Sequence, residues 1–153
     1  MPRAFLAMAA MYGALDRKAS PLAPALRALV QVRVSQINWC SFCIDLNSAT
    51  CLKREVSDEQ LAALPEYAES ALFDEREKAA LGYAEAMTHS DRGGDPDLIA
   101  LLRRHFSDDA IIELTALIAY QNMSSKFNAA LGVPAQGFCE SARRSAAPRQ
   151  ADN

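Results

Sequence analysis

Signals for the start of a helix recur along this chain and constrain its fold more than any other feature. Ser57-Asp-Glu-Gln60 and Asp74-Glu-Arg-Glu77 have the form of a capping box, in which side chains at both ends of the motif satisfy free backbone amides. Ser20-Pro21 and Asp95-Pro96 each place a capping residue before a proline that suits the first helical position, and Ser107 precedes a long apolar segment. No segment gives a convincing strand pattern. The sequence therefore predicts an all-α fold.

Apolar residues at three- and four-residue spacing between these signals outline the expected helices. We expect a single-domain bundle of about six or seven helices, with the approximate limits 2–16, 21–38, 40–54, 57–65, 74–90, 95–105 and 108–131. Gly132 and Pro134 stop the last of them. The prediction is an all-helical domain over residues 1–137, followed by a flexible polar tail over 138–153.

The composition restricts the partners and the compartment. Half of the 153 residues are apolar, more than a solvated monomer of this length needs, and this points to a homo-oligomer. The net charge of −3 gives no general attraction to nucleic acid, and there is no run of 18 apolar residues to span a bilayer. The apolar stretch 4–15 lacks a clean cleavage site, so we interpret it as a packed helix. We expect a cytoplasmic protein with no nucleic-acid or membrane partner.

Cys40 and Cys43 are the strongest chemical signal in the chain. Their i, i+3 spacing at a helix start puts both thiols on one face, where the free amides of the helix end favour thiolate over thiol. A thiolate attacks a peroxide oxygen to give sulfenic acid, and a second thiol then condenses with it to a disulfide. Other interpretations are a thioredoxin motif, which needs flanking strands, a pair of inert buried thiols, and a zinc site. The residues available as further zinc ligands lack the usual spacing: Cys51, His89, His105 and Cys139.

Three segments, Ser35–Leu46 around the cysteines, Phe73–Leu81 and Phe127–Pro134, carry a resemblance to a known family. Together they look like the carboxymuconolactone decarboxylase family, especially its alkylhydroperoxidase D-like branch, over about residues 21–137. The resemblance implies an all-α fold, a homo-oligomer (trimer or hexamer), and no metal or organic cofactor. It also implies a peroxidase of the peroxiredoxin-activity type. In that activity Cys43 reacts with the peroxide, Cys40 resolves the product as a disulfide, and a dithiol reductant regenerates the pair.

Four positions depart from the pattern of that branch. Ala28 stands where a Glu is typical, twelve residues before the first cysteine, and Asn47 stands where a His follows the second. Gln36 replaces an acidic residue, and Trp39 replaces a glycine. None of the four accepts a proton near neutral pH, although Gln36, Asn47 and Trp39 are candidates for binding substrate or relaying through water. Losing a general base costs roughly 100- to 10,000-fold in rate, so the sequence fits a slow or differently tuned enzyme as well as an efficient one.

Two alternatives to a thiol peroxidase stay open. One is a decarboxylase-type enzyme acting on a small lactone acid, which needs cationic or acid–base groups in its pocket, and Arg33 is the nearby candidate. The other is a non-catalytic helical oligomer. Among the remaining polar residues we interpret Asp45 as a surface or interface charge, and His89 as the end of a helix. The last long helix carries Tyr120, Asn122 and Asn128, and its apolar spacing indicates a core helix. Of these three, Asn122 is the candidate to reach the site.

Overall fold

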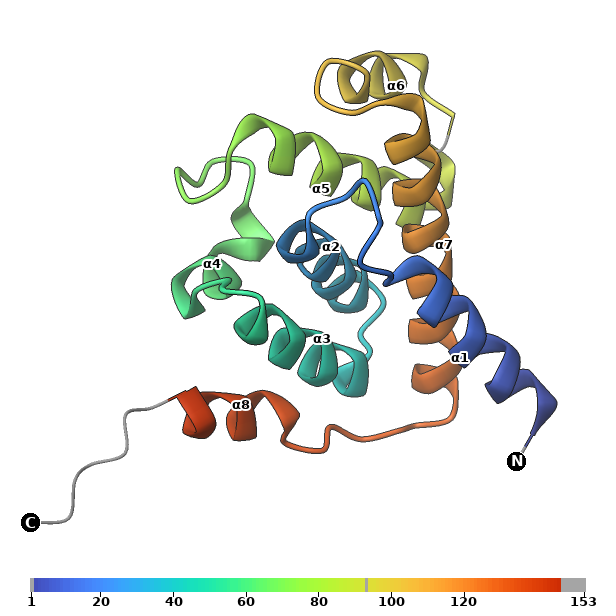
Figure 1. Ribbon diagram of the computed structural model, residues 1–153, viewed down its shortest axis with the longest axis vertical. Coiled ribbons are helices and arrows are strands. Elements are labelled where there is room, and N and C mark those ends of the chain that lie inside the picture. Colours follow the sequence, from blue (N-terminus) through green and yellow to red (C-terminus); the bar gives the residue numbers. More distant parts are fainter. Residues whose placement is uncertain (1, 93, 147–153) are drawn as a thin grey trace, which may run out of the picture.

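Helix α2, Pro24–Ile37, lies at the centre of this computed structural model, with α3, α5 and α7 packed around it (Figure 1). The structure describes residues 2–92 and 94–146. The buried face of α2 carries Leu26, Leu29, Val30 and Val34, which pack with apolar side chains of α5 and α7 to form the core. The predicted all-α fold is confirmed, because the described part of the chain contains helices and no strand.

The described residues form eight α-helices, slightly more than the six or seven expected. Two short 3₁₀ turns, Leu64–Glu66 and Ser90–Arg92, extend the ends of α4 and α5. The eight helices are α1 Arg3–Leu15, α2 Pro24–Ile37, α3 Ser41–Lys53, α4 Asp58–Ala63, α5 Glu75–Thr88, α6 Pro96–Leu102, α7 Asp108–Ala130 and α8 Phe138–Ala146.

Predicted capping residues begin several of these helices. At the start of α5 the Asp74 carboxylate accepts a hydrogen bond from the Glu77 amide at 2.7 Å. The Glu77 carboxylate in turn accepts one from the Asp74 amide at 3.0 Å, which completes the capping box. Ser107 caps α7 and Asp95 caps α6 through the same kind of bond. At these positions the local sequence is sufficient to set where the helix starts.

The start of α2 is three residues later than predicted. Helix α2 begins at Pro24 with Ala23 as its N-cap, not at Pro21. The hydroxyl of Ser20, the predicted cap, instead donates to the carboxylate of Glu113 on α7 at 3.0 Å. Pro21 and Pro24 both supply the backbone angle that suits the first turn of a helix, and the contact of Ser20 with α7 favours the later start.

Helix α8 corrects the prediction of a flexible tail from residue 138 onward. Residues 138–146 are helical and pack along α3, while 147–153 lie outside the described residues (Figure 1). Asp45 on α3 explains this, because its carboxylate accepts hydrogen bonds from the backbone amides of Gln136, Phe138 and Cys139 at 2.8–3.0 Å. Asp45 is thus a helix cap within the chain and not only a surface charge. The domain boundary at residue 137 stays a prediction.

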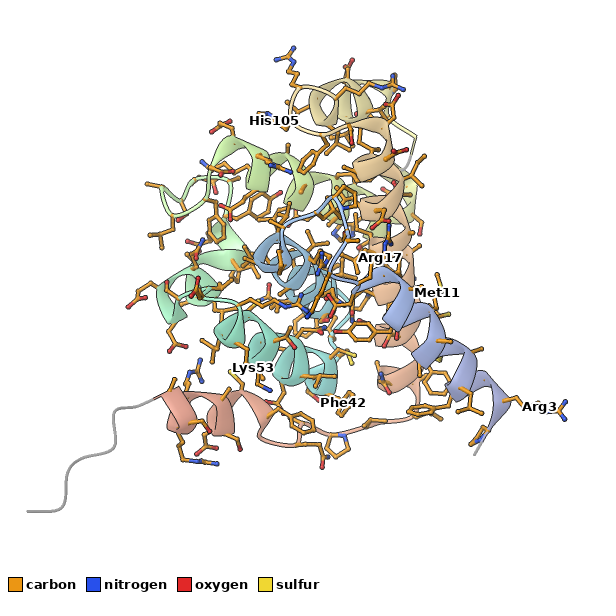
Figure 2. The ribbon with its side chains drawn as sticks, viewed as in Figure 1. Arg3, Met11, Arg17, Phe42, Lys53 and His105 are labelled. Carbon is orange, nitrogen blue, oxygen red and sulfur yellow. The ribbon has the colours of Figure 1, made fainter. Side chains whose placement is uncertain are left out.

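Helix α1 lies on the outside of α7 and none of its residues is fully buried (Figure 1). Met11 points away from the rest of the molecule (Figure 2). The segment after α1 is anchored by Arg17, which pairs with Glu113 on α7, and by Asp16, which pairs with Arg27 and Arg54. Of the helices described, none is long and apolar enough to cross a membrane.

Candidate active site

The turn between α2 and α3 places Cys40 at the N-cap of α3. The Cys40 amide donates to the carbonyl of Ser35 at 3.1 Å, which ends α2, and the Cys40 sulfur accepts from the Cys43 amide at 3.2 Å. Trp39 in the turn has φ +53°, in the left-handed region that favours glycine, and its side chain is 89% exposed. Both cysteines are free thiols, and both are almost wholly buried. The turn therefore sets the two sulfurs in the first turn of one helix.

A cavity of about 590 Å³ lies between α1, α3 and α7, and Cys43 is part of its wall. Cys40 is not among the lining residues, so the two thiols differ in what they can reach. Most of the wall is aromatic or aliphatic. The lining residues are Phe5, Met8, Ala9, Tyr12, Gln31, Phe42, Cys43, Leu46, Asn47, Thr50, Tyr120, Gln121, Ser124, Phe127, Asn128, Leu131 and Val133.

Aromatic pairs close two sides of this cavity. The Tyr12 and Tyr120 rings hold α1 against α7, with their centroids 5.9 Å apart. Phe42, which lies between α3 and the segment leading into α8, meets Phe138 edge-to-face at 6.1 Å (Figure 2). Such contacts bury apolar area and fix the ring orientations. Three of these four rings, those of Tyr12, Phe42 and Tyr120, line the cavity together with Cys43.

The floor of the cavity is a network of neutral polar side chains. Ser35 donates to the backbone carbonyl of Gln31 at 2.6 Å and accepts hydrogen bonds from the amides of Asn47, at 3.2 Å, and Gln121, at 3.0 Å. Gln121 also accepts from the Gln31 amide at 3.3 Å and donates to Ser125 at 2.9 Å. Buried polar groups are stable when they are paired in this way. The network joins α2, α3 and α7, and none of its members is charged.

Burial affects the titration of Cys40 and of a neighbouring tyrosine. Burial, together with a side-chain hydrogen bond between the two thiols, raises the pKa of Cys40 to about 12, against the smaller opposite effect of the Cys43 amide, so Cys40 is protonated at neutral pH. Burial, with a smaller contribution from Cys43, also raises the pKa of Tyr120 above its ordinary value. No Asp, Glu, His, Lys or Arg is among the described residues that line the cavity. Among its described lining residues the site therefore offers the Cys43 thiol and neutral hydrogen-bonding groups, but no carboxylate or histidine to act as a base.

Comparison with known proteins identifies the family. The model of the carboxymuconolactone decarboxylase family matches residues 2–86, more than half of the chain. The chain belongs to this family. It is also 41% identical over 139 residues to the uncharacterized protein YnjA of Escherichia coli K12, covering 91% of this chain and 76% of that protein.

Solved structures place this family member in the alkylhydroperoxidase D-like branch. ATU0492 of Agrobacterium tumefaciens, a protein of unknown function named as a candidate antioxidant defence protein AhpD, superposes with a TM-score of 0.83. Its sequence identity is 28%, over 89% of this chain and 92% of that one. An uncharacterized peroxidase-related protein from Silicibacter has a TM-score of 0.79 and 25% identity, over 88% and 71% of the two chains.

The sequence-predicted residues of this carboxymuconolactone decarboxylase family member separate into two groups. Cys43 and Asn47 both line the cavity, with Cys40 beside Cys43. Gln36 and Trp39 do not line it: Gln36 accepts from Arg33 at 3.1 Å, and Trp39 projects into solvent. The structure thus brings together the cysteines and Asn47 and leaves the other two candidates outside the cavity.

Three residues named from the sequence have other partners. Arg33 donates to the carboxylate of Glu85 at 2.7 Å and does not line the cavity. Asn122 accepts from Asn38 at 2.8 Å and donates to Thr88 at 3.1 Å, so it joins helices away from the cavity. His89 is the residue that ends α5, as expected.

Sequence reasoning missed the polar residues that α2 and α7 supply. Gln31 and Gln121 line the floor, and Asn128 faces Cys43 from the opposite wall. The only signal for them is their polarity on helices whose spacing otherwise indicates a core. Gln31 and Gln121 are 90 positions apart, and Asn128 is 85 positions from Cys43. The local sequence therefore contains no sign that these residues meet.

Proposed function

We propose that this protein is a thiol peroxidase that reduces organic hydroperoxides, with Cys43 as the attacking thiol and Cys40 as the resolving thiol. The observation that carries the proposal is the different placement of the two sulfurs. Cys43 faces a cavity large enough for a small organic molecule, whereas Cys40 lies behind it at the helix cap. The fold is that of a branch with a peroxidase-related member, and this supports the same activity.

The chemistry follows in two balanced steps. The Cys43 thiolate attacks one peroxide oxygen, an S–O bond forms as the O–O bond breaks, and the alkoxide that leaves takes a proton from water to become an alcohol. The Cys40 sulfur then attacks Cys43 sulfenic acid. An S–S bond forms, the S–O bond breaks, and the hydroxide leaves as water with the proton of the Cys40 thiol. An external dithiol reduces the disulfide and completes the cycle.

The cavity favours an uncharged substrate with an apolar body. Its walls are aromatic and aliphatic, and its polar groups are amides and hydroxyls that bind a hydroperoxide group without a charge. An anionic lactone acid would lose its hydration there with no cation to replace it, because Arg33 is paired elsewhere. This observation favours peroxide reduction over the decarboxylase-type alternative.

We also propose that the protein acts in the cytoplasm as a homo-oligomer. Apolar side chains of α1 and the end of α7, among them Phe5, Leu6 and Leu131, are more than half exposed. Exposed apolar groups at this density are typical of a face that is covered by another copy. A trimer or hexamer is the expected assembly, and light scattering distinguishes either from a monomer of 16.7 kDa.

The experiment is peroxide consumption with dithiothreitol as the dithiol, using cumene hydroperoxide and hydrogen peroxide. The variants are Cys43→Ser and, as a matched control, Cys51→Ser, because Cys51 is a buried thiol on the same helix that does not line the cavity. We expect Cys43→Ser to lose turnover, Cys51→Ser to keep it, and cumene hydroperoxide to be the better substrate. Turnover that survives in Cys43→Ser would exclude the proposal.

A further inference from the structure

Asn128 on α7 places its side-chain amide next to the sulfur of Cys43. Its amide nitrogen lies 3.5 Å from the Cys43 sulfur, an ordinary distance for an N–H group that donates to sulfur. The Cys43 sulfur also has a side-chain hydrogen bond with Cys40, its neighbour at the start of α3, whereas Asn128 reaches it from another helix. Asn128 lies on α7, across the cavity from α3, and far from the CxxC motif in sequence, so the motif does not point to it.

The orientation of the Asn128 amide is set by the preceding turn of α7. Its nitrogen also donates to the backbone carbonyl of Ser124 at 3.0 Å and lies 3.5 Å from the Ser124 hydroxyl oxygen. If the amide were turned over, its own oxygen would face the Ser124 carbonyl oxygen, and two acceptors would oppose each other. One amide hydrogen is therefore committed to Ser124, which leaves the other directed at Cys43.

We infer that Asn128 is a catalytic residue that donates a hydrogen bond to the Cys43 thiolate and holds this sulfur toward the cavity. The inference rests on the proposed function for its place in the reaction, but its physical content is independent of it. A donor stabilises an anionic sulfur more than a neutral thiol, because the charged form is the better acceptor. Asn128 thus favours the reactive form without accepting the proton itself.

The other groups around Cys43 are uncharged, and the Cys40 thiol is a second, weaker donor to the same sulfur. From α3 the neighbouring Cys40 is a protonated thiol, and from α2 the cavity receives the neutral Gln31. The phenols of Tyr12 on α1 and Tyr120 on α7 have pKa values raised first of all by burial, so they stay uncharged. Helices α4, α5, α6 and α8 contribute no lining residue.

The test is the pH dependence of Cys43 alkylation by iodoacetamide in the reduced protein, followed by mass spectrometry of the Cys43 peptide. We expect Asn128→Ala to move the pH of half-maximal reaction upward by about one unit, the size of one hydrogen bond to a charged group. Asn128→Asp should move it further, because a carboxylate repels the thiolate. Asn122→Ala is the control, since Asn122 lies on the same helix away from the cavity, and it should leave the midpoint unchanged.

The outcomes separate a catalytic from a structural role. A residue that only packs α7 would lower the melting temperature and leave the alkylation midpoint where it is. A folded Asn128→Ala variant with the wild-type midpoint therefore overturns the inference, and alanine is the substitution least able to disturb a helix. Because no peroxide is used, a protein without peroxidase turnover can still show the shift. A peroxidase whose midpoint does not depend on Asn128 keeps the proposed function and loses only this inference.

Discussion

The first turns of α5 and α3 satisfy their free amides with different atoms: a carboxylate of Asp74 in α5 and a thiol of Cys40 in α3. The carboxylate is among the best N-caps, and Glu77 completes the box, whereas sulfur is a weak acceptor. The residue before Cys40 is Trp39, with a positive φ that costs a non-glycine residue energy. The capping box therefore stabilises the start of α5 more than the cysteine cap stabilises the start of α3. The less stable α3 start is the one that holds two thiols in a single turn.

The largest expected effect comes from changing the α3 cap itself. Cys40→Ser keeps an N-cap acceptor but removes the resolving thiol, so we expect steady-state peroxide turnover to fall to the slow rate at which the external dithiol reduces Cys43 sulfenic acid directly, while Cys43 still reacts once. The unfolding free energy should stay the same or rise, because serine is a better cap than cysteine. Urea unfolding and a stopped-flow turnover assay measure both quantities. Full turnover in this variant would show that Cys40 does not resolve the reaction.

The second effect tests the lack of a base around α3. Because no described lining residue accepts a proton, the initial rate should rise by about tenfold per pH unit while the Cys43 thiol is mostly protonated. Asn47→His places a base with a near-neutral pKa on the cavity floor and should raise the rate at pH 7 and flatten the profile. Initial rates between pH 6 and 9 are the measurement. A flat wild-type profile would mean that an unrecognised group already takes the proton.

The third effect concerns the α5 start alone. Asp74→Ala removes the capping box and should lower the unfolding free energy by about 1 kcal/mol, with no change in peroxide turnover, because α5 contributes no residue to the cavity. Urea unfolding gives the first quantity and the turnover assay the second. A loss of activity in a protein that remains folded would contradict the separation between scaffold and site.

The smallest effect is expected at Trp39. Trp39→Gly removes the strain of a positive φ, and little packing is lost because the side chain is exposed. Glycine also makes the unfolded chain more flexible, so the net gain in unfolding free energy should be only about 0.5 kcal/mol. Thermal unfolding at matched pH checks this, with Glu55→Gly as the comparison, since Glu55 also has a positive φ. Strong destabilisation by Trp39→Gly would show that the indole makes contacts that matter.

The helix starts were predicted correctly where a hydrogen bond between residues close in sequence determines them. The caps at Asp74, Asp95 and Ser107 lie within three residues of the amides they bind, so the sequence contains the whole interaction. The start of α2 and the helix α8 depend on Ser20 with Glu113 and on Asp45 with the Cys139 amide, pairs that are more than 90 positions apart. Such contacts are invisible to a local pattern.

The candidate site divides in the same way. Cys40 and Cys43 are adjacent along one helix, so their motif identifies them directly. Gln31, Gln121 and Asn128 meet Cys43 or its surroundings only because α2 and α7 pack against α3. Conversely, Gln36 near the end of α2 and Trp39 in the turn after it are close to the motif in sequence, but neither lines the cavity. Proximity in sequence is therefore a poor guide to the neutral groups of this site.

The central claim is that Cys43, and not Cys40, attacks the peroxide, because Cys43 faces the cavity and burial keeps Cys40 protonated with a pKa of about 12. The most direct measurement is dimedone trapping of sulfenic acid in Cys40→Ser and Cys43→Ser after one equivalent of cumene hydroperoxide at pH 7, read by peptide mass spectrometry. We predict that Cys40→Ser carries the label on Cys43 and that Cys43→Ser remains unlabelled. Label on Cys40 in the Cys43→Ser variant, at a rate similar to that of Cys43, would contradict the account.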